Sequence, residues 1–300
     1  MPTAPPGSSQ VKVFLNSAGG SADDAKKELE AAGLEVEEIP ADQLKSRLER
    51  AIAEGSTRLM VAGGDGTIGT GAALVAKTST ELAILPAGTL NHFAKDHGIP
   101  TDLAEAAAVA LNGTVENADL GYVHDNLFLN TSSIGAYVTF VRVRERFEKN
   151  FGYTIASFLA LVRVFSSMRT FGVELEVEGR KKSYRTAMVF IGVGERELKL
   201  PTLGSRVENG KRGLHVMIVQ GRRPARLFAV AMAAVARGTK GAAALPQFDA
   251  FIVDSCEIDL GRPDATIALD GELKRMQTPL KYRIERDAIR LVVPAERESK

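Results

Sequence analysis

Two glycine-rich loops carry the residues whose types and spacing point most directly to chemistry. The first runs from Gly63 to Thr67 and reads GGDGT, and the second places Gly88 and Thr89 just ahead of Asn91. Glycine lets the backbone approach a phosphate closely, and a helix that begins at such a loop adds free N–H groups and positive potential. Asp65 would repel a phosphate unless a cation lay between them. The pattern therefore predicts a cradle for a nucleotide and Mg²⁺.

The first loop also has two other interpretations. The first matches G-x-G-x-x-G from Gly64 to Gly69, but it follows the third expected strand and holds a carboxylate, which argues against a dinucleotide fingerprint. Taken alone, it could also be an ordinary Asp-Gly turn between a strand and a helix. Two such loops after neighbouring strands would meet at one edge of a sheet, and this convergence favours phosphate binding.

The first 120 residues alternate short apolar segments with helical patterns, which predicts βαβ units and a parallel sheet. Ligands of such sheets bind at the carboxyl ends of the strands. We expect strands over residues 11–15, 34–39, 58–62 and 82–85, and helices over residues 22–32, 42–54, 67–77, 90–97 and 102–111.

Strand patterns dominate the rest of the chain and predict a mostly β, sandwich-like second domain. Helical patterns are expected over 140–168 and 224–237. The expected strands cover 127–131, 173–178, 187–193, 214–219, 248–253, 256–260, 266–269, 280–284 and 289–293. The predicted organisation is a disordered lead-in over 1–10, a nucleotide-binding domain over 11–120 and a substrate domain over 121–300, whose last strands could return to the first domain.

The two loops together resemble a known family. GGDGT followed by LPAGTLNHFAKDHGIP is similar to the diacylglycerol kinase catalytic domain, which is found in bacterial lipid kinases and in diacylglycerol, sphingosine and ceramide kinases. The resemblance is strongest over residues 11–119. It implies a Rossmann-like α/β N-terminal domain, as in NAD kinases and diacylglycerol kinases, and transfer of a phosphoryl group from ATP to a lipid hydroxyl, with diacylglycerol or a related lipid as the acceptor.

The resemblance also implies roles for individual residues. Asp270-Gly271-Glu272 matches a segment in which the glutamate is the proposed base, and Asp119 matches a residue of the metal network. Glu272 and Asp65 are therefore the expected catalytic residues in a cleft between the domains, and Asp65, Asp119 and Asp270 are the expected Mg²⁺ ligands. The expected nucleotide contacts are Asn16, Gly63, Gly64, Asp65, Gly66, Thr67, Gly88, Thr89 and Asn91.

Several positions depart from the family pattern. Asn16 is not followed by proline, Pro40 follows the second strand where a threonine is usual, and Arg212-Gly213 or Asn209-Gly210 stands where an Asp-Gly would bind a structural Mg²⁺. Arginine cannot ligate Mg²⁺, which argues against that structural site. These departures keep open a catalytically inactive nucleotide- or lipid-binding module. An NAD kinase-like enzyme is the other alternative, because it shares GGDGT but not PAGTLNHFA.

The charge is distributed unevenly along the chain. Residues 1–120 hold 9 basic and 17 acidic side chains, a net charge of −8, whereas residues 121–300 hold 29 and 20, a net charge of +9. Residues 141–169 mix six basic and two acidic side chains with apolar ones. Such a stretch could be a pair of packed helices with solvated faces, or it could lie on an anionic membrane surface. With the family resemblance, we expect a lipid substrate and peripheral membrane contact.

Composition excludes several other classes of protein. Cys256 is the single cysteine, so no intramolecular disulfide can form. The longest uncharged apolar run, residues 227–236, is far shorter than the ~20 residues of a membrane-spanning helix. Absence of Trp and of a basic stripe with interleaved aromatics argues against nucleic-acid binding. We expect a soluble cytoplasmic protein, and homodimer formation is left open.

Overall fold

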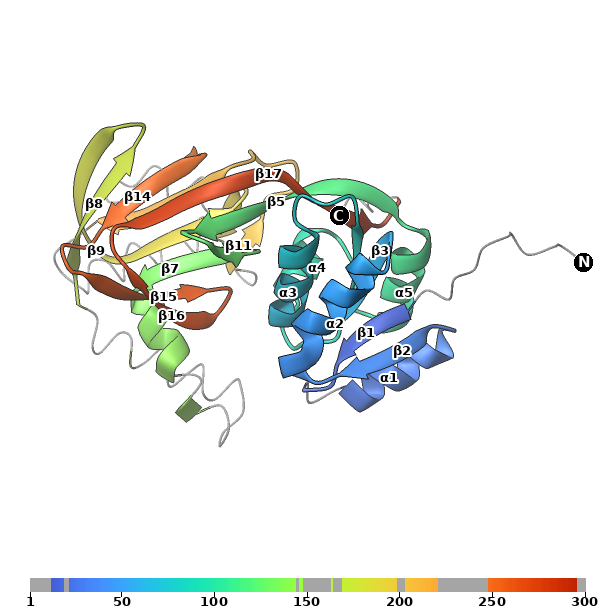
Figure 1. The fold of residues 1–300 in the computed structure, drawn as a ribbon. Coiled ribbons are helices and arrows are strands. Elements are labelled where there is room, and N and C mark those ends of the chain that lie inside the picture. Colours follow the sequence, from blue (N-terminus) through green and yellow to red (C-terminus); the bar gives the residue numbers. More distant parts are fainter. Residues whose placement is uncertain are drawn as a thin grey trace, which may run out of the picture. The chain divides into compact units, whose positions relative to one another are not determined.

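The chain divides into two compact units. The computed structural model describes residues 12–18, 22–143, 146–147, 163, 169–198, 203–220 and 248–295. The first unit is Met1–Ala118 together with Asp287–Lys300, and the second unit is Asp119–Arg286. The boundaries fall inside the strands β5 (Thr114–Val123) and β17 (Leu280–Val293) (Figure 1). The expected lead-in over 1–10, the expected helix over 224–237 and most of the expected helical stretch over 140–168 lie outside the described residues.

The first unit contains a parallel sheet with the strand order β2-β1-β3-β4, and the C-terminal part of β17 pairs with β4 in parallel. The middle strands are buried on both faces, as expected when helices cover a parallel sheet. The predicted α/β fold is therefore confirmed. Its strands are β1 (Lys12–Asn16), β2 (Glu35–Ile39), β3 (Arg58–Gly63) and β4 (Glu81–Pro86).

Among the described residues of this unit, three helices connect the strands β1 to β4, and two more follow β4 and lead to β5. Helix α1 contacts α5, and α2 contacts α3, and right-handed crossovers place these two pairs on opposite faces of the sheet. Helix α5 begins where the side chain of Asp102 accepts a hydrogen bond from the Glu105 N–H at 3.0 Å, which satisfies one of the free donors of its first turn. The helices are α1 (Ala22–Ala31), α2 (Ala41–Ala53), α3 (Asp65–Val75), α4 (His92–Asp96) and α5 (Leu103–Asn112).

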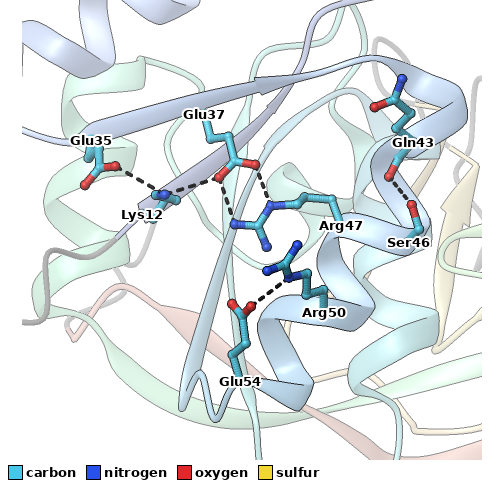
Figure 2. A network of polar contacts seen from close by, with 8 residues as sticks. All are labelled: Lys12, Glu35, Glu37, Gln43, Ser46, Arg47, Arg50 and Glu54. Atoms are coloured by element: carbon cyan, nitrogen blue, oxygen red, sulfur yellow. Dashed lines mark hydrogen bonds and ion pairs between the residues drawn. The ribbon is translucent and has the colours of Figure 1, made fainter.

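A polar network ties the edge strand β2 to its neighbours (Figure 2). Glu37 accepts two hydrogen bonds from the Arg47 guanidinium, at 2.5 and 2.9 Å, and lies 3.3 Å from the Lys12 ammonium. The Arg47 guanidinium also stacks over the ring of Phe14, 5.1 Å from its centre. The Arg47 bond lowers the pKa of Glu37. The acidic edge strand is thus held by cations from β1 and α2.

The second unit is built from antiparallel strands, so the predicted mostly β second domain is confirmed. Neighbours run β16-β15-β7-β9-β8-β14-β17, and β12 pairs with β9 and β13. Its core includes Ile191, Ile258 and Tyr282, and the Tyr282 hydroxyl lies 2.9 Å from the buried Ser132 hydroxyl. The other strands are β6 (Asn126–Phe128), β7 (Thr131–Gly135), β8 (Phe171–Val177), β9 (Arg180–Val193), β10 (Arg196–Leu198), β11 (Leu203–Arg206), β12 (Leu214–Gln220), β13 (Phe248–Val253), β14 (Ser255–Asp259), β15 (Asp264–Leu269) and β16 (Glu272–Gln277).

Some expected elements differ from the observed ones. The expected strand over 127–131 is wrong, because β6 ends at Phe128 and β7 begins at Thr131. The two strands expected over 280–284 and 289–293 are the single strand β17. The sequence prediction missed β5, β10, β11, β16 and all but the first residue of β7. Strand β16 buries only Met276, so its apolar pattern is weak. No helix among the described residues is long and apolar enough to cross a membrane.

Candidate active site

Three loops of the first unit meet at the carboxyl edge of its sheet. Asn16 ends β1, Gly63 ends β3 and Pro86 ends β4, and these three strands are adjacent and parallel. Parallel pairing brings the chain segments that leave the strands to one edge, where helix N-termini also lie. The residues predicted to contact nucleotide therefore gather within this unit.

The two glycine-rich loops touch through their backbones. A Cβ added to Gly88 would lie 2.5 Å from the Cα of Gly64 and 2.8 Å from Oδ1 of Asn91. A Cβ added to Gly64 would lie 3.5 Å from the Cα of Gly88, which is ordinary van der Waals contact. Only glycine fits at position 88 without displacing the other loop.

Asp65 connects the first loop to the second. It is the first residue of α3, and its Oδ2 accepts a hydrogen bond from the His92 N–H at 3.2 Å. Its Oδ1 accepts from the Phe93 N–H at 3.1 Å. These two N–H groups belong to the first turn of α4, which lacks intrahelical partners for them. One carboxylate therefore caps α4 and fixes the distance between the loops.

Asn91 shapes the second loop from within. It is 6% exposed and adopts a left-handed conformation with φ 50°, which asparagine tolerates better than most residues. Its Oδ1 accepts from the Gly88 N–H at 3.0 Å, and its Nδ2 donates to the carbonyls of Pro86 and Gly88 at 3.1 and 2.8 Å. The Asn91 side chain thus holds the loop closed, because its amide bonds to the backbone of the loop itself.

Asn16 lies against the start of α3. Its Nδ2 donates to Oγ1 of Thr67 at 2.8 Å, and its Oδ1 accepts from the Ala18 N–H at 3.0 Å. Thr67 is buried directly beneath Gly63, where an added Cβ would meet its side chain at 2.6 Å. Gly66 and Thr89 are exposed. The loop after β1 is therefore joined to GGDGT by a hydrogen bond between side chains.

In the second unit, Asp270 and Gly271 form a two-residue turn between β15 and β16. Both residues have positive φ, 45° and 88°, while Leu269 pairs with Glu272 across the hairpin, as in a type I′ turn. The Asp270 carboxylate accepts three backbone N–H groups, from Leu129 at 2.6 Å and from the next two residues at 2.8 and 2.9 Å. Glu272 follows the turn and is exposed.

Asp119 has a different partner. Its side chain is 2% exposed, and both of its oxygens accept hydrogen bonds from the Arg212 guanidinium, with Nε 2.9 Å from Oδ2. Protein donors thus hold both carboxylates expected to bind metal in this unit, Asp119 and Asp270. Within the described part of the chain, no group of three or more His, Cys, Asp or Glu side chains could hold a metal ion.

Sequence reasoning missed two partners in this arrangement. The His92 and Phe93 N–H groups donate to Asp65 across 27 and 28 residues, and Arg212 pairs with Asp119 across 93 residues. Position 212 stood out as a departure from the family pattern, but nothing in the sequence pairs it with Asp119.

Comparison with protein families agrees with this geometry. Residues 10–123 match the model of the diacylglycerol kinase catalytic domain. The matched residues include both glycine-rich loops and extend into β5.

Curated relatives match over part of their length. A Pseudomonas putida protein named "Probable lipid kinase YegS-like" is 40% identical over 133 residues, which are 43% of this chain and 44% of that protein. A Mycobacterium tuberculosis protein named "Diacylglycerol kinase" is 37% identical over 102 residues, 33% of each chain. The chain thus aligns with less than half the length of either relative.

Solved structures share the fold of the whole chain. A diacylglycerol kinase crystal structure from Bacillus anthracis str. Sterne has a TM-score of 0.66 at 18% identity and covers 95% of this chain and 97% of its own. An Archaeoglobus fulgidus NAD kinase in complex with ATP has a TM-score of 0.51 at 13% identity, with 96% and 94% covered. The diacylglycerol kinase fold therefore extends through both units.

Proposed function

We propose that this protein is an ATP-dependent lipid kinase that transfers the γ-phosphoryl group to the hydroxyl of diacylglycerol or a related lipid. The observation that carries the proposal is the contact between the two glycine-rich loops, clamped by Asp65 through the His92 and Phe93 N–H groups. Such a rigid backbone surface at the start of a helix is suited to binding phosphates. The match of residues 10–123 to the family model supports the same conclusion.

The first unit would bind the nucleotide. The first N–H groups of α3 have no partners within the helix, so those of Gly66 and Thr67 are available to phosphate oxygens. Asn16 holds Thr67 in place through its Nδ2. Asn91 keeps the second loop closed against the first through Gly88. Positioning and electrostatic stabilisation account for most of the catalysis in phosphoryl transfer.

The residues of the first loop fit a Mg²⁺ ion that is shared with a nucleotide. A carboxylate has about four lone-pair sites, and the His92 and Phe93 N–H groups use two of those on Asp65. Mg²⁺ is usually held by one or two carboxylates together with substrate phosphates and water. Asp65 would hold it here, and the bound ion would offset the charge that develops on the transferred group. Asp119 and Asp270 do not fit this role, because protein donors hold both carboxylates.

Glu272 would act as the general base in the second unit. Its exposed carboxylate can accept the proton of an acceptor hydroxyl. Asp270 would act as a positioning residue, since its three N–H bonds fix the turn that precedes Glu272 to the segment between β6 and β7. Glu272→Gln should lower turnover by roughly 10²–10⁴-fold, with unchanged ATP affinity. Glu257→Gln, at a partly exposed β14 position in the same unit, is the control.

A lipid acceptor implies contact with a membrane surface, so we also propose peripheral membrane binding. Residues 141–169, whose basic and apolar composition suggested this contact, lie mostly outside the described residues. Sedimentation with vesicles of anionic and of neutral lipid measures it directly. Binding that prefers anionic vesicles is the expected result, and no binding to either kind would contradict the proposal.

A radiolabelled ATP assay tests the proposed function. The protein is incubated with Mg²⁺ and labelled ATP over a panel of lipids in mixed micelles, with NAD as the aqueous control. Label in the organic phase is expected and identifies the lipid class. Label on NAD would favour the NAD kinase-like alternative, and retained ATP binding without any labelled product would favour an inactive binding module. Asp65→Asn should abolish turnover, and unaltered turnover would contradict the role of Asp65.

A further inference from the structure

The second unit buries a carboxylate in the strand β5. Asp119 lies between Ala118 and Leu120, which are 3% and 0% exposed, and its own side chain is 2% exposed. A buried carboxylate is compatible with a stable fold only where a cation or several hydrogen-bond donors compensate for the lost hydration. The second unit must therefore supply a cation or hydrogen-bond donors at Asp119.

Arg212 supplies both the charge and the donors. Its Nε donates to Oδ2 of Asp119 at 2.9 Å and its Nη2 donates to Oδ1, so the guanidinium meets the carboxylate with two parallel bonds. The Arg212 side chain is 41% exposed, so it covers the carboxylate from the solvent side. Guanidinium is planar, always charged and weakly hydrated, which suits it to this position better than an ammonium group.

The backbone around Arg212 holds it in this position. The Glu195 N–H donates to the Lys211 carbonyl at 3.0 Å, and the Gly194 N–H donates to the Gly213 carbonyl at 2.8 Å. The Lys211 N–H in turn donates to the Glu195 carboxylate at 2.9 Å. Residues on both sides of Arg212 are thus bonded to the turn that follows β9. The arginine is presented to Asp119 by a fixed segment.

We infer that Arg212 is the built-in cation of the second unit, occupying at Asp119 the role that a divalent ion would otherwise fill. Family resemblance implies a metal-binding Asp-Gly near this segment, and the chain has Arg212-Gly213 there. Mg²⁺ requires near-octahedral oxygen ligands, whereas a guanidinium holds both oxygens of Asp119. The second unit therefore folds without a divalent ion at this carboxylate. This inference does not depend on the proposed kinase activity.

Calorimetric unfolding of the full chain tests the inference. The unfolding temperature of the wild-type protein should be the same in EDTA and in millimolar Mg²⁺. Arg212→Ala should lower it by roughly 10 °C, because a buried carboxylate loses the charge and the two hydrogen bonds of the guanidinium. Arg275→Ala is the matched control, since Arg275 makes the same two-bond contact to Asp264 on the surface of the same unit, with side chains 74% and 40% exposed. We expect it to shift the unfolding temperature by no more than about 2 °C.

A double variant keeps the test interpretable if Arg212→Ala folds poorly. In a chain with Asp119→Asn, Arg212→Ala should lower the unfolding temperature much less than in the wild-type chain, because the buried carboxylate that Arg212 compensates has been removed. Equal effects of Arg212→Ala and Arg275→Ala would overturn the inference. So would an increase in the wild-type unfolding temperature with Mg²⁺ that Asp119→Asn abolishes, since Asp119 would then be a metal ligand.

Discussion

The contact between the two glycine-rich loops predicts an asymmetric response to alanine. In Gly88→Ala the new Cβ would lie 2.5 Å from the Cα of Gly64, against 3.4 Å or more for an ordinary contact. The neighbouring atoms are a backbone carbon and the Oδ1 of Asn91, which itself bonds the loop. The loops must therefore separate by about 1 Å, since no flexible side chain can move aside.

This separation should be costly. Overpacking of this kind destabilises by about 1–3 kcal/mol, which corresponds to about 3–10 °C in the unfolding temperature of a unit of this size. Displacement of catalytic groups by 1 Å can lower turnover by on the order of 100-fold. Gly64→Ala is the matched control, because its Cβ meets Gly88 at 3.5 Å and its φ of −81° suits any residue.

Two measurements check the prediction. Calorimetry should give Gly88→Ala an unfolding temperature several degrees below that of the wild-type protein. The free energy of unfolding of Gly64→Ala should lie within about 1 kcal/mol of the wild-type value. Titration with a fluorescent ATP analogue, followed by the labelled-ATP assay, should then show weakened nucleotide binding and turnover in Gly88→Ala. A Gly88→Ala protein with wild-type stability and turnover would refute the backbone contact and, with it, the proposed phosphate cradle.

Three further predictions follow from other contacts. Asp270→Asn replaces one acceptor oxygen by an NH2 group that faces at least one of the three N–H donors, so we expect the free energy of unfolding to fall by ~2 kcal/mol. Turnover should fall at an unchanged Mg²⁺ requirement, and a changed requirement would make Asp270 a metal ligand. The Arg47 bond lowers the pKa of Glu37, so the ion pair stabilises the fold above pH ~4.5 and this stabilisation is lost as the pH falls further. Glu37→Gln should lower the free energy of unfolding by up to about 1 kcal/mol at pH 7, and urea unfolding should show a smaller decrease of that free energy at acid pH than in the wild-type protein. An unchanged pH dependence would contradict the pairing. Burial raises the pKa of the Cys256 thiol to about 12, so a thiol reagent at pH 8 should label it only after unfolding, and rapid labelling of the native protein would contradict its burial.

Local patterns accounted for the first unit because its elements depend on neighbouring residues. Apolar residues repeat with helical spacing in α1 and α2, and Gly33 and Gly55 follow these helices with φ of 82° and 92°, as helix C-termini prefer. Strand β16 lacked such a signal, since its sequence ELKRMQ buries only Met276. It is a strand because it pairs with β15 over six residues. Pairing of that kind is decided by the sheet rather than by the segment.

The sequence by itself determined that two glycine loops end adjacent parallel strands, and it indicated the lipid kinase family, because short motifs and apolar periodicity carry that information. Only the tertiary structure decided what each acidic side chain contacts. Asp270 accepts a hydrogen bond from a backbone N–H 141 positions away, and Asp119 accepts from Arg212 across 93 positions. These partners come together only when the antiparallel strands of the second unit pair in register. No local pattern records that register, so the same aspartates suggested metal ligands in the sequence and are held by protein donors in the fold.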